Sequence, residues 1–339
     1  MTRGFRCSSV VRFLTLVLCT IVTLASTPRA FAQTPLKIAY SDWPGWVAWE
    51  VAIQKGFFKE AGVDVEFVWF EYLPSMEAFA AGKVDAVCVT NGDALVTGGT
   101  GKPSTGILLN DFSDGNDKIV AKPGISSIKE LKGKKVGLEL NLVEHLMLLK
   151  ALELNGMKES DVTLVNFPTN DTPQALASGG VDAIGAWYPI AGQTLKQVAG
   201  SKALFSSHDV QGLIYDTLTV SRESLAAHRA DWAKVVKVWF KTVAYIKDPK
   251  TRDEAIKIMA ARVKVTPEEY AKNMEGTFLL DLDGNLKHFK DGSTLESLPF
   301  SSKTADAFNV KYKVYKEPQD IKSYVDPSLV MQYAKEVGK

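Results

Sequence analysis

The sequence predicts an α/β protein built of two lobes, and three observations support this fold class. From Leu36 onward, apolar segments of strand length alternate with amphipathic segments of helix length. The same order of segments returns about a hundred residues later. The chain of 339 residues is also long enough to bury two separate cores. Because strand–helix–strand alternation is typical of parallel strands joined by right-handed crossovers, we expect parallel-type sheets flanked by helices.

The first copy of the pattern covers the early part of the chain. Pro44 stands at the first turn of its first predicted helix, and Gly56 ends that helix. The predicted elements, in chain order, are strand 37–40, helix 46–56, strand 63–70, helix 74–82 and strand 84–89.

The second copy repeats these five elements. EAFAAGKVDAVCV in the first copy and QALASGGVDAIGA in the second share the same spacing of Ala, Gly and Val-Asp-Ala. This internal similarity predicts the same local topology in both lobes. The predicted elements are strand 134–139, helix 143–156, strand 161–167, helix 171–180 and strand 181–187.

Residues 1–32 have the pattern of a signal peptide. MTRGFRCSSVVR is basic, FLTLVLCTIVTLA is apolar, and Ala30-Phe31-Ala32 provides a cleavage signal before Gln33. The apolar stretch is too short for a comfortable membrane span. We therefore expect a protein that is exported to the periplasm.

The order of the segments after residue 32 predicts that the chain leaves the first lobe and later returns to it. We expect residues 33–118 to begin lobe 1, residues 119–214 to form lobe 2, and residues 215–339 to return to lobe 1 with C-terminal helices. Two extended crossings, near residues 117–121 and 212–217, then join the lobes.

Composition and motifs exclude several function classes. Residues 1–32 hold four Arg and no acid, so the mature chain has 36 basic and 39 acidic residues and a net charge of −3. This balance, without a basic run, argues against a nucleic-acid partner. Cys88 is then the single cysteine, so we expect no disulfide and no thiolate metal site. The four His form no metal-binding spacing, and no P-loop, GxSxG or GxGxxG motif occurs, so we expect no catalytic residue, metal or cofactor.

Acids and tryptophans gather beyond the predicted strand ends, where α/β sheets bind ligands. Taken singly, each acid is explained by helix capping or solvation. Together, carboxylates and indole faces suit a small cationic or planar group, because a desolvated cation–π contact contributes up to about 2 kcal/mol. The candidate ligand-binding residues are the aromatic Trp43, Trp46 and Trp187 and the acidic Asp42, Asp93, Asp111, Glu144 and Asp216.

Four stretches of the chain carry a resemblance to a known family: KIAYSDWPGWVAWEVAIQKGFFKEAGVDVEF, AFAAGKVDAVCVTNGDAL, SIKELKGKKVGLELNLVEHLMLLKAL and ALASGGVDAIGAWYP. In this order they resemble the periplasmic solute-binding proteins of ABC importers, in the nitrate/sulfonate/taurine group. The resemblance implies the two-lobed type II periplasmic-binding-protein fold with a hinge of two crossings. It also implies a monomer that closes on a small-molecule solute and delivers it to an ABC permease with a cytoplasmic ATPase.

The resemblance also adds His145 to the candidate ligand-binding residues. Relatives commonly carry Gly-Ser ahead of the helix with this His, and those residues hold an anionic head group. Here the stretch reads Asn141-Leu142-Val143-Glu144-His145, so the small hydroxyl residue is missing and an acid stands beside the His. We therefore predict a small nitrogenous solute, either a guanidine- or amine-like cation or an uncharged planar amide or pyrimidine.

Three alternatives remain open on the sequence alone. The same fold binds a sulfonate, taurine or nitrate if helix N-termini hold the anion. A ligand-loaded sensor that docks onto a membrane receptor has the same sequence signature as a transport protein. Enzymes that make the thiamine pyrimidine share this architecture, but their chemistry draws on active-site His and Cys, which are scarce here.

Overall fold

The computed structural model describes residues 34–339. The expected signal peptide, residues 1–32, lies outside the described residues. Within residues 34–339, no helix is long and apolar enough to cross a membrane.

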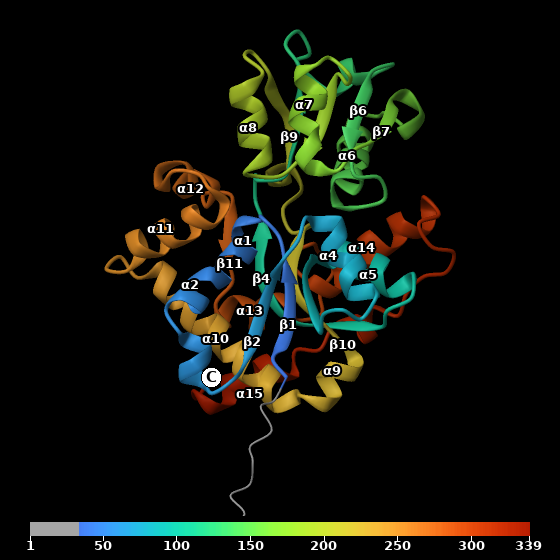
Figure 1. The fold of residues 1–339 in the computed structure, drawn as a ribbon. Coiled ribbons are helices and arrows are strands. Elements are labelled where there is room, and N and C mark those ends of the chain that lie inside the picture. Colours follow the sequence, from blue (N-terminus) through green and yellow to red (C-terminus); the bar gives the residue numbers. More distant parts are fainter. Residues whose placement is uncertain (1–33) are drawn as a thin grey trace, which may run out of the picture. The chain divides into compact units, whose positions relative to one another are not determined.

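A six-stranded sheet contains the first copy of the sequence pattern, in the strand order β11-β4-β10-β3-β1-β2. Figure 1 labels β1, β2, β4, β10 and β11 of this sheet. The central strand β1 pairs in parallel with β2 on one side and with β3 on the other. Strands β10, β4 and β11 extend the sheet in antiparallel pairs. The strands are β1 (Leu36–Tyr40), β2 (Val65–Trp69), β3 (Ala86–Thr90), β4 (Ser104–Ser113), β10 (Tyr215–Ser221) and β11 (Thr277–Leu279).

A five-stranded sheet contains the second copy, in the order β7-β6-β8-β5-β9. Strand β6 pairs in parallel with β7 and β8, whereas β5 runs antiparallel to both β8 and β9. The strands are β5 (Lys118–Ala121), β6 (Lys135–Leu138), β7 (Thr163–Asn166), β8 (Ala183–Ala186) and β9 (Lys202–Ser206). We use "lobe 2" for residues 118–206, which carry this sheet, and "lobe 1" for the other described residues.

The predicted internal repeat is present in the structure. The parallel triplets β2-β1-β3 and β7-β6-β8 have the same strand order. The repeated Asp of the Val-Asp-Ala motif has the same structural role in both: Asp85 Oδ2 accepts the backbone N–H of Lys37, and Asp182 Oδ2 accepts that of Lys135, each at 2.9 Å. The motif therefore fixes the start of a neighbouring strand.

The predicted α/β fold class is confirmed, and the sheets as a whole are mixed. The parallel triplets are as predicted, but strands from distant parts of the chain add antiparallel pairs to each. Strand β10, which the return of the chain to lobe 1 supplies, inserts between β3 and β4 and is buried along its whole length.

Helices cover both sheets. In lobe 1, α10 lies against the sheet with its apolar stripe, and Trp239 on this stripe packs on Trp49 with ring centroids 4.7 Å apart. The lobe 1 helices are α1 (Pro44–Val47), α2 (Trp49–Gln54), α3 (Phe57–Ala61), α4 (Tyr72–Ala80), α5 (Asn91–Gly99), α9 (Arg222–Ala227), α10 (Arg229–Lys247), α11 (Arg252–Val263), α12 (Pro267–Asn273), α13 (Leu282–His288), α14 (Leu298–Lys311) and α15 (Ser328–Glu336). Those of lobe 2 are α6 (Val143–Leu154), α7 (Thr172–Ala177) and α8 (Ile190–Gln197).

The predicted helix 46–56 is divided at Ala48 into α1 and α2. This division places Trp46 and Trp49 in different surroundings. Trp49 is completely buried in the core, whereas Trp46 lines the pocket described below.

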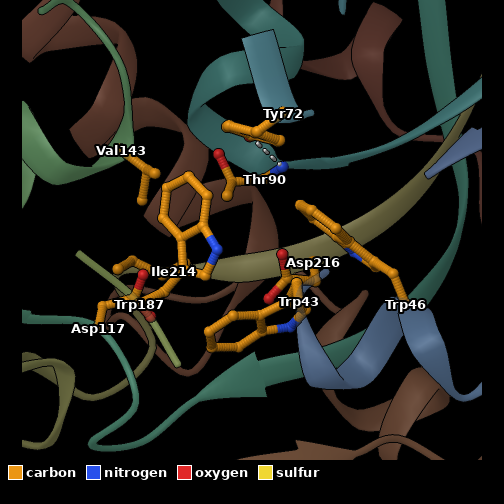
Figure 2. Close-up of a pocket in the computed structure, with 9 residues that line it drawn as sticks. All are labelled: Trp43, Trp46, Tyr72, Thr90, Asp117, Val143, Trp187, Ile214 and Asp216. Atoms are coloured by element: carbon orange, nitrogen blue, oxygen red, sulfur yellow. Dashed lines mark hydrogen bonds between the residues drawn. The ribbon is translucent and has the colours of Figure 1, made fainter. Parts of the chain in front are cut away.

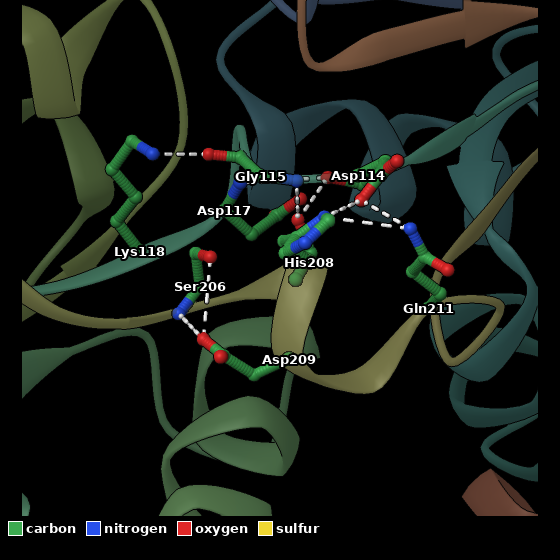
Figure 3. Close-up of polar contacts among 10 residues, drawn as sticks. Asp114, Gly115, Asp117, Lys118, Ser206, His208, Asp209 and Gln211 are labelled. Atoms are coloured by element: carbon green, nitrogen blue, oxygen red, sulfur yellow. Dashed lines mark hydrogen bonds and ion pairs between the residues drawn. The ribbon is translucent and has the colours of Figure 1, made fainter.

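The chain passes from β4 to β5 between Ser113 and Lys118 and returns from β9 to β10 between Ser206 and Tyr215. The two crossings are hydrogen-bonded to each other, as Figure 3 shows for several of their residues. The backbone N–H of Gly115 donates to Ser207 Oγ at 2.7 Å, and Gln211 Nε2 donates to Asp114 Oδ1 at 2.9 Å. His208 Nδ1 lies 2.6 Å from the same oxygen of Asp114.

Candidate functional site

A small pocket lies where the strand ends of lobe 1 meet α6 and the end of β8 (Figure 2). Its cavity volume is about 10 Å³, the room of roughly one water molecule, so the lobes must separate before a solute can enter. Its walls carry four aromatic rings, two carboxyl groups and the hydroxyl groups of Tyr72 and Thr90, and the lining includes no Lys, Arg or His. The lining residues are Trp43, Trp46, Tyr72, Thr90, Asp117, Val143, Trp187, Ile214 and Asp216.

Four aromatic rings form most of the wall, and each is at most 3 % exposed. The ring of Trp46 stacks on that of Tyr72, with centroids 5.4 Å apart and an interplanar angle of 22°. Tyr72 meets Trp187 of lobe 2 edge to face at 5.3 Å. Trp43 lies 6.4 Å from Trp46. Rings held in this way offer their faces to a cation or to a flat group.

The ring nitrogens of the tryptophans are not equivalent. Trp43 Nε1 donates to Asp111 Oδ1 at 2.9 Å, and Trp187 Nε1 donates to Asp42 Oδ1 at 3.0 Å. Trp46 Nε1 is buried and has no hydrogen-bond partner in the described protein. It is therefore a donor that a ligand acceptor could satisfy.

Two hydrogen bonds join the lobes beside the pocket. The first is the bond from Trp187 to Asp42. In the second, the backbone N–H of Val143 at the start of α6 donates to Asp93 Oδ2 at 3.2 Å. The Tyr72 hydroxyl donates to the same oxygen of Asp93 at 2.7 Å, so this carboxylate is held from both sides.

The carboxyl groups of the site are arranged in close pairs. Asp111 and Asp216 stand directly opposite each other on the antiparallel strands β4 and β10. Glu144, in the first turn of α6, lies beside Asp117 of the first crossing, and the charge of Asp117 acts on it. All four side chains are at most 2 % exposed, and Glu144 has no hydrogen-bonding cation or backbone donor among the described residues.

Burial shifts the protonation of this acidic cluster. Burial raises the pKa of Asp93 and Asp117 to about 6 and that of Asp111 to about 7. Burial, followed by the charges of neighbouring carboxylates, raises the pKa of both Glu144 and Asp216 well above the ordinary value.

Two further acids lie at the edge of the cluster. Burial raises the pKa of Asp42, which is half-buried, to about 6, and that of Glu139 to about 7. Glu139 Oε1 accepts the backbone N–H of Thr169 at 3.2 Å. Because they are buried close together, these carboxyl groups bind protons at a higher pH than exposed acids do.

The structure places His145 away from the pocket lining. Its Nδ1 accepts the backbone N–H of Asn141 at 3.1 Å, and its Nε2 lies 3.4 Å from Glu159. The ring packs against Phe308 and Tyr312 of α14, with centroids 5.7 and 6.1 Å away. Burial lowers the pKa of His145, so it is a neutral side chain at the contact between α6 and α14.

The candidate residues named from the sequence fall into three groups. Asp42, Asp93 and Asp111 accept hydrogen bonds from residues around the pocket. Glu144 stands behind Asp117, and His145 lies apart. The remaining four, Trp43, Trp46, Trp187 and Asp216, line the pocket itself.

Sequence reasoning missed Tyr72 and Asp117. Tyr72 begins α4 shortly after β2 ends, so the strand-end rule that selected Trp43 would also have selected it. Asp117 belongs to the crossing between the sheets, and its position in the pocket depends on how the two lobes meet.

Comparison with known proteins agrees with this fold. The model of the family described as "NMT1/THI5 like" matches residues 44–251. A protein of Brucella abortus (strain 2308), described as a binding protein, is 27 % identical over 295 residues, which cover 86 % of this chain and 89 % of the relative. An aliphatic sulfonates-binding protein of Bacillus subtilis (strain 168) is 25 % identical over 295 residues and 84 % of each chain. The crystal structure of the periplasmic aliphatic sulphonate-binding protein of Escherichia coli superposes with a TM-score of 0.72 at 18 % identity, over 88 % of this chain and 99 % of that one.

Proposed function

This chain belongs to the NMT1/THI5-like family, and from that premise we propose that it is an exported solute-binding protein for a small nitrogenous cation. The solute is a guanidine- or amine-like cation, bound in the pocket between the lobes and passed to an ABC permease with its ATPase. A planar amide or pyrimidine that carries N–H donors is the neutral variant of the same class.

The observation that supports a cation is the chemistry of the pocket wall. Aromatic faces and the carboxyl groups of Asp117 and Asp216 surround the space, and the lining has no basic side chain to receive an anion. A hydrogen bond to a charged group contributes roughly 1.5–3 kcal/mol and a desolvated cation–π contact up to about 2 kcal/mol. Two or three such contacts, less the cost of immobilising the solute, are compatible with micromolar affinity, about 8 kcal/mol.

The sulfonate-binding relatives make an anionic solute the second candidate. An anion would use the free N–H groups at the start of α6. In this chain the Asp93 carboxylate already accepts the N–H of Val143 there, so a protein acid occupies the position that suits an anionic oxygen. Repulsion between Asp93 and an incoming anion argues against this candidate.

An enzyme of the thiamine-pyrimidine type is less well supported. Cys88 is fully buried in β3 and burial raises the pKa of its thiol well above the ordinary value, so it is not poised as a nucleophile. His145 is held between α6 and α14, away from the pocket.

Native mass spectrometry of freshly purified protein, followed by titration calorimetry, tests the proposal. The panel is guanidinium, methylammonium, urea, taurine and nitrate. We expect a co-purified nitrogenous compound and binding of at least one of the two cations. Tight binding of taurine or nitrate without a response to either cation would refute the proposed solute class.

A further inference from the structure

The register of the six-stranded sheet sets two acids against each other at the base of the pocket. Asp216 of β10 is the direct cross-strand partner of Asp111 of β4. Directly opposed side chains on antiparallel strands have Cβ atoms about 4.5–5.5 Å apart, and like charges in such a pair are destabilising. Both side chains are buried, at 1 % and 0 % exposure. This arrangement needs a compensating positive charge or a shared proton.

Only one member of the pair faces the ligand space. Asp216 lines the pocket, whereas Asp111 stands behind it, with Oδ1 bonded to Trp43 Nε1. The backbone of Gly45 covers Asp111 Oδ2 so closely that a Cβ built on that glycine would lie 1.8 Å from this oxygen. Asp216 Oδ2 is buried without a hydrogen-bond partner in the described protein. Asp216 is therefore the member of this pair that an incoming solute meets, beside Asp117 in the same lining.

Among residues 34–339, the charges that act most strongly on Asp216 are those of other acids, and the titratable Tyr72 lines the same pocket. Besides Asp111, the charges of Asp117 and Asp93 act on Asp216, and Cys88 on the neighbouring strand β3 feels its charge. Lys118, the lysine nearest in sequence, acts on Asp117 and donates to the carbonyl of Gly115. Two opposed buried carboxyl groups in these surroundings titrate as a pair that holds one proton.

We propose that Asp216 is the specificity-determining carboxyl group of the cleft: it keeps its proton while the cleft is empty and releases that proton to solvent when a cationic solute binds. This inference rests on the proposed function. The charges balance, because a neutral carboxyl group and a free cation become a carboxylate–cation pair and a proton taken up by the buffer. A neutral amide has no charge with which to displace the proton. The solute must also donate an N–H bond, because Asp216 Oδ2 has no other donor.

Calorimetry of the unaltered protein in two buffers of different ionisation enthalpy counts the protons exchanged. With guanidinium or methylammonium at about pH 7, we expect release that approaches one proton per cation bound. Tetramethylammonium, which has no N–H, should bind at least tenfold more weakly. Cation binding without proton release, or equal affinity for tetramethylammonium, overturns the inference and leaves the proposed cation function standing. Absence of binding by every cation overturns the inference and the proposed cation, and only binding of a neutral amide such as urea would then keep the proposed solute class.

Three variants separate the role of Asp216 from a structural one. Asp216→Asn has nearly the same shape as the protonated acid, so the protein should fold and lose both proton release and at least tenfold in cation affinity. Asp111→Asn keeps an oxygen for Trp43 Nε1 and removes the opposing charge. It should therefore abolish proton release while the cation still binds. Asp283→Asn, which removes one exposed carboxylate, is the matched control and should change neither quantity. If Asp111→Asn releases the same number of protons as the unaltered protein, the pair is not the source and the inference fails.

Discussion

Trp187 of lobe 2 donates its indole N–H to Oδ1 of Asp42 in lobe 1, across 3.0 Å. The bond joins a residue just after β8 in one parallel triplet to a residue just after β1 in the other. Since Trp187 also lines the pocket and Asp42 does not, the indole links the solute space to the contact between the lobes. If the lobes close on a solute as proposed, closure is favoured by contacts that exist only in the closed state.

Replacement of Asp42 should therefore affect closure through its oxygen and not through its charge. Asp42→Ala removes the acceptor of Trp187 Nε1, and we expect solute affinity to fall about tenfold or more, because a hydrogen bond to a charged group contributes roughly 1.5–3 kcal/mol. Asp42→Asn retains the acceptor and is the matched control. Calorimetry gives the affinity, and small-angle scattering gives the closed fraction. Equal losses in both variants would show that the charge of Asp42 matters more than the bond.

Tyr72→Phe should weaken the second bond between the lobes. The hydroxyl group donates to Asp93 and accepts the backbone N–H of Thr90 at 3.2 Å. Its loss leaves a buried N–H unpaired, which costs about 1–3 kcal/mol, and leaves Asp93 with fewer donors. The ring that stacks on Trp46 remains. We expect a lower melting temperature and weaker binding, measured by thermal denaturation and calorimetry. An unchanged affinity would place Tyr72 in the wall of the pocket as a ring alone.

Gly45→Ala should displace the Asp111 carboxyl group and lower the stability of the protein. The added Cβ would lie 1.8 Å from Asp111 Oδ2, and the bond from Trp43 Nε1 holds that carboxyl group in place. Overpacking of this kind costs roughly 1–3 kcal/mol. Gly106→Ala, whose Cβ would come no closer than 3.4 Å to another group, is the control. Circular dichroism melts should show a lower midpoint for the first variant only; equal midpoints would mean that α1 moves aside without cost.

The stability of the empty protein should fall as the pH rises from about 5.5 to about 8. Asp93, Asp117 and Asp111 have folded-state pKa values of about 6, 6 and 7, above the ordinary value of about 4. The folded chain therefore binds more protons than the unfolded chain across this window, and the free energy of unfolding decreases with pH. His145, with a lowered pKa, acts in the opposite sense below about pH 6.5.

Scanning calorimetry at the two pH values measures this effect. We expect a lower midpoint at the higher pH and a partial recovery there when guanidinium is present, because a bound cation compensates the ionised carboxylates. A midpoint that rises with pH would show that the buried acids are already ionised or paired with cations.

The parallel part of the fold could be predicted from the sequence because it depends on local patterns. Strand and helix periodicities, and the repeated Val-Asp-Ala segments, predicted both triplets of parallel strands, and Asp85 and Asp182 make the same local bond in each. The antiparallel strands could not be placed in this way, because the position of β10 between β3 and β4 is fixed by partners more than a hundred residues away in the chain.

The sequence by itself determined that aromatic and acidic residues stand at the strand ends, since strand direction sends those ends to one edge of each sheet. Only the tertiary structure decided which of them act together. Asp216 meets Asp111 because of strand register, and Asp42 meets Trp187 because the lobes approach each other. His145 packs on α14 because its side of α6 faces that helix and not the pocket. Spacing along a chain sets the direction in which a side chain leaves its element, but long-range packing sets what it meets.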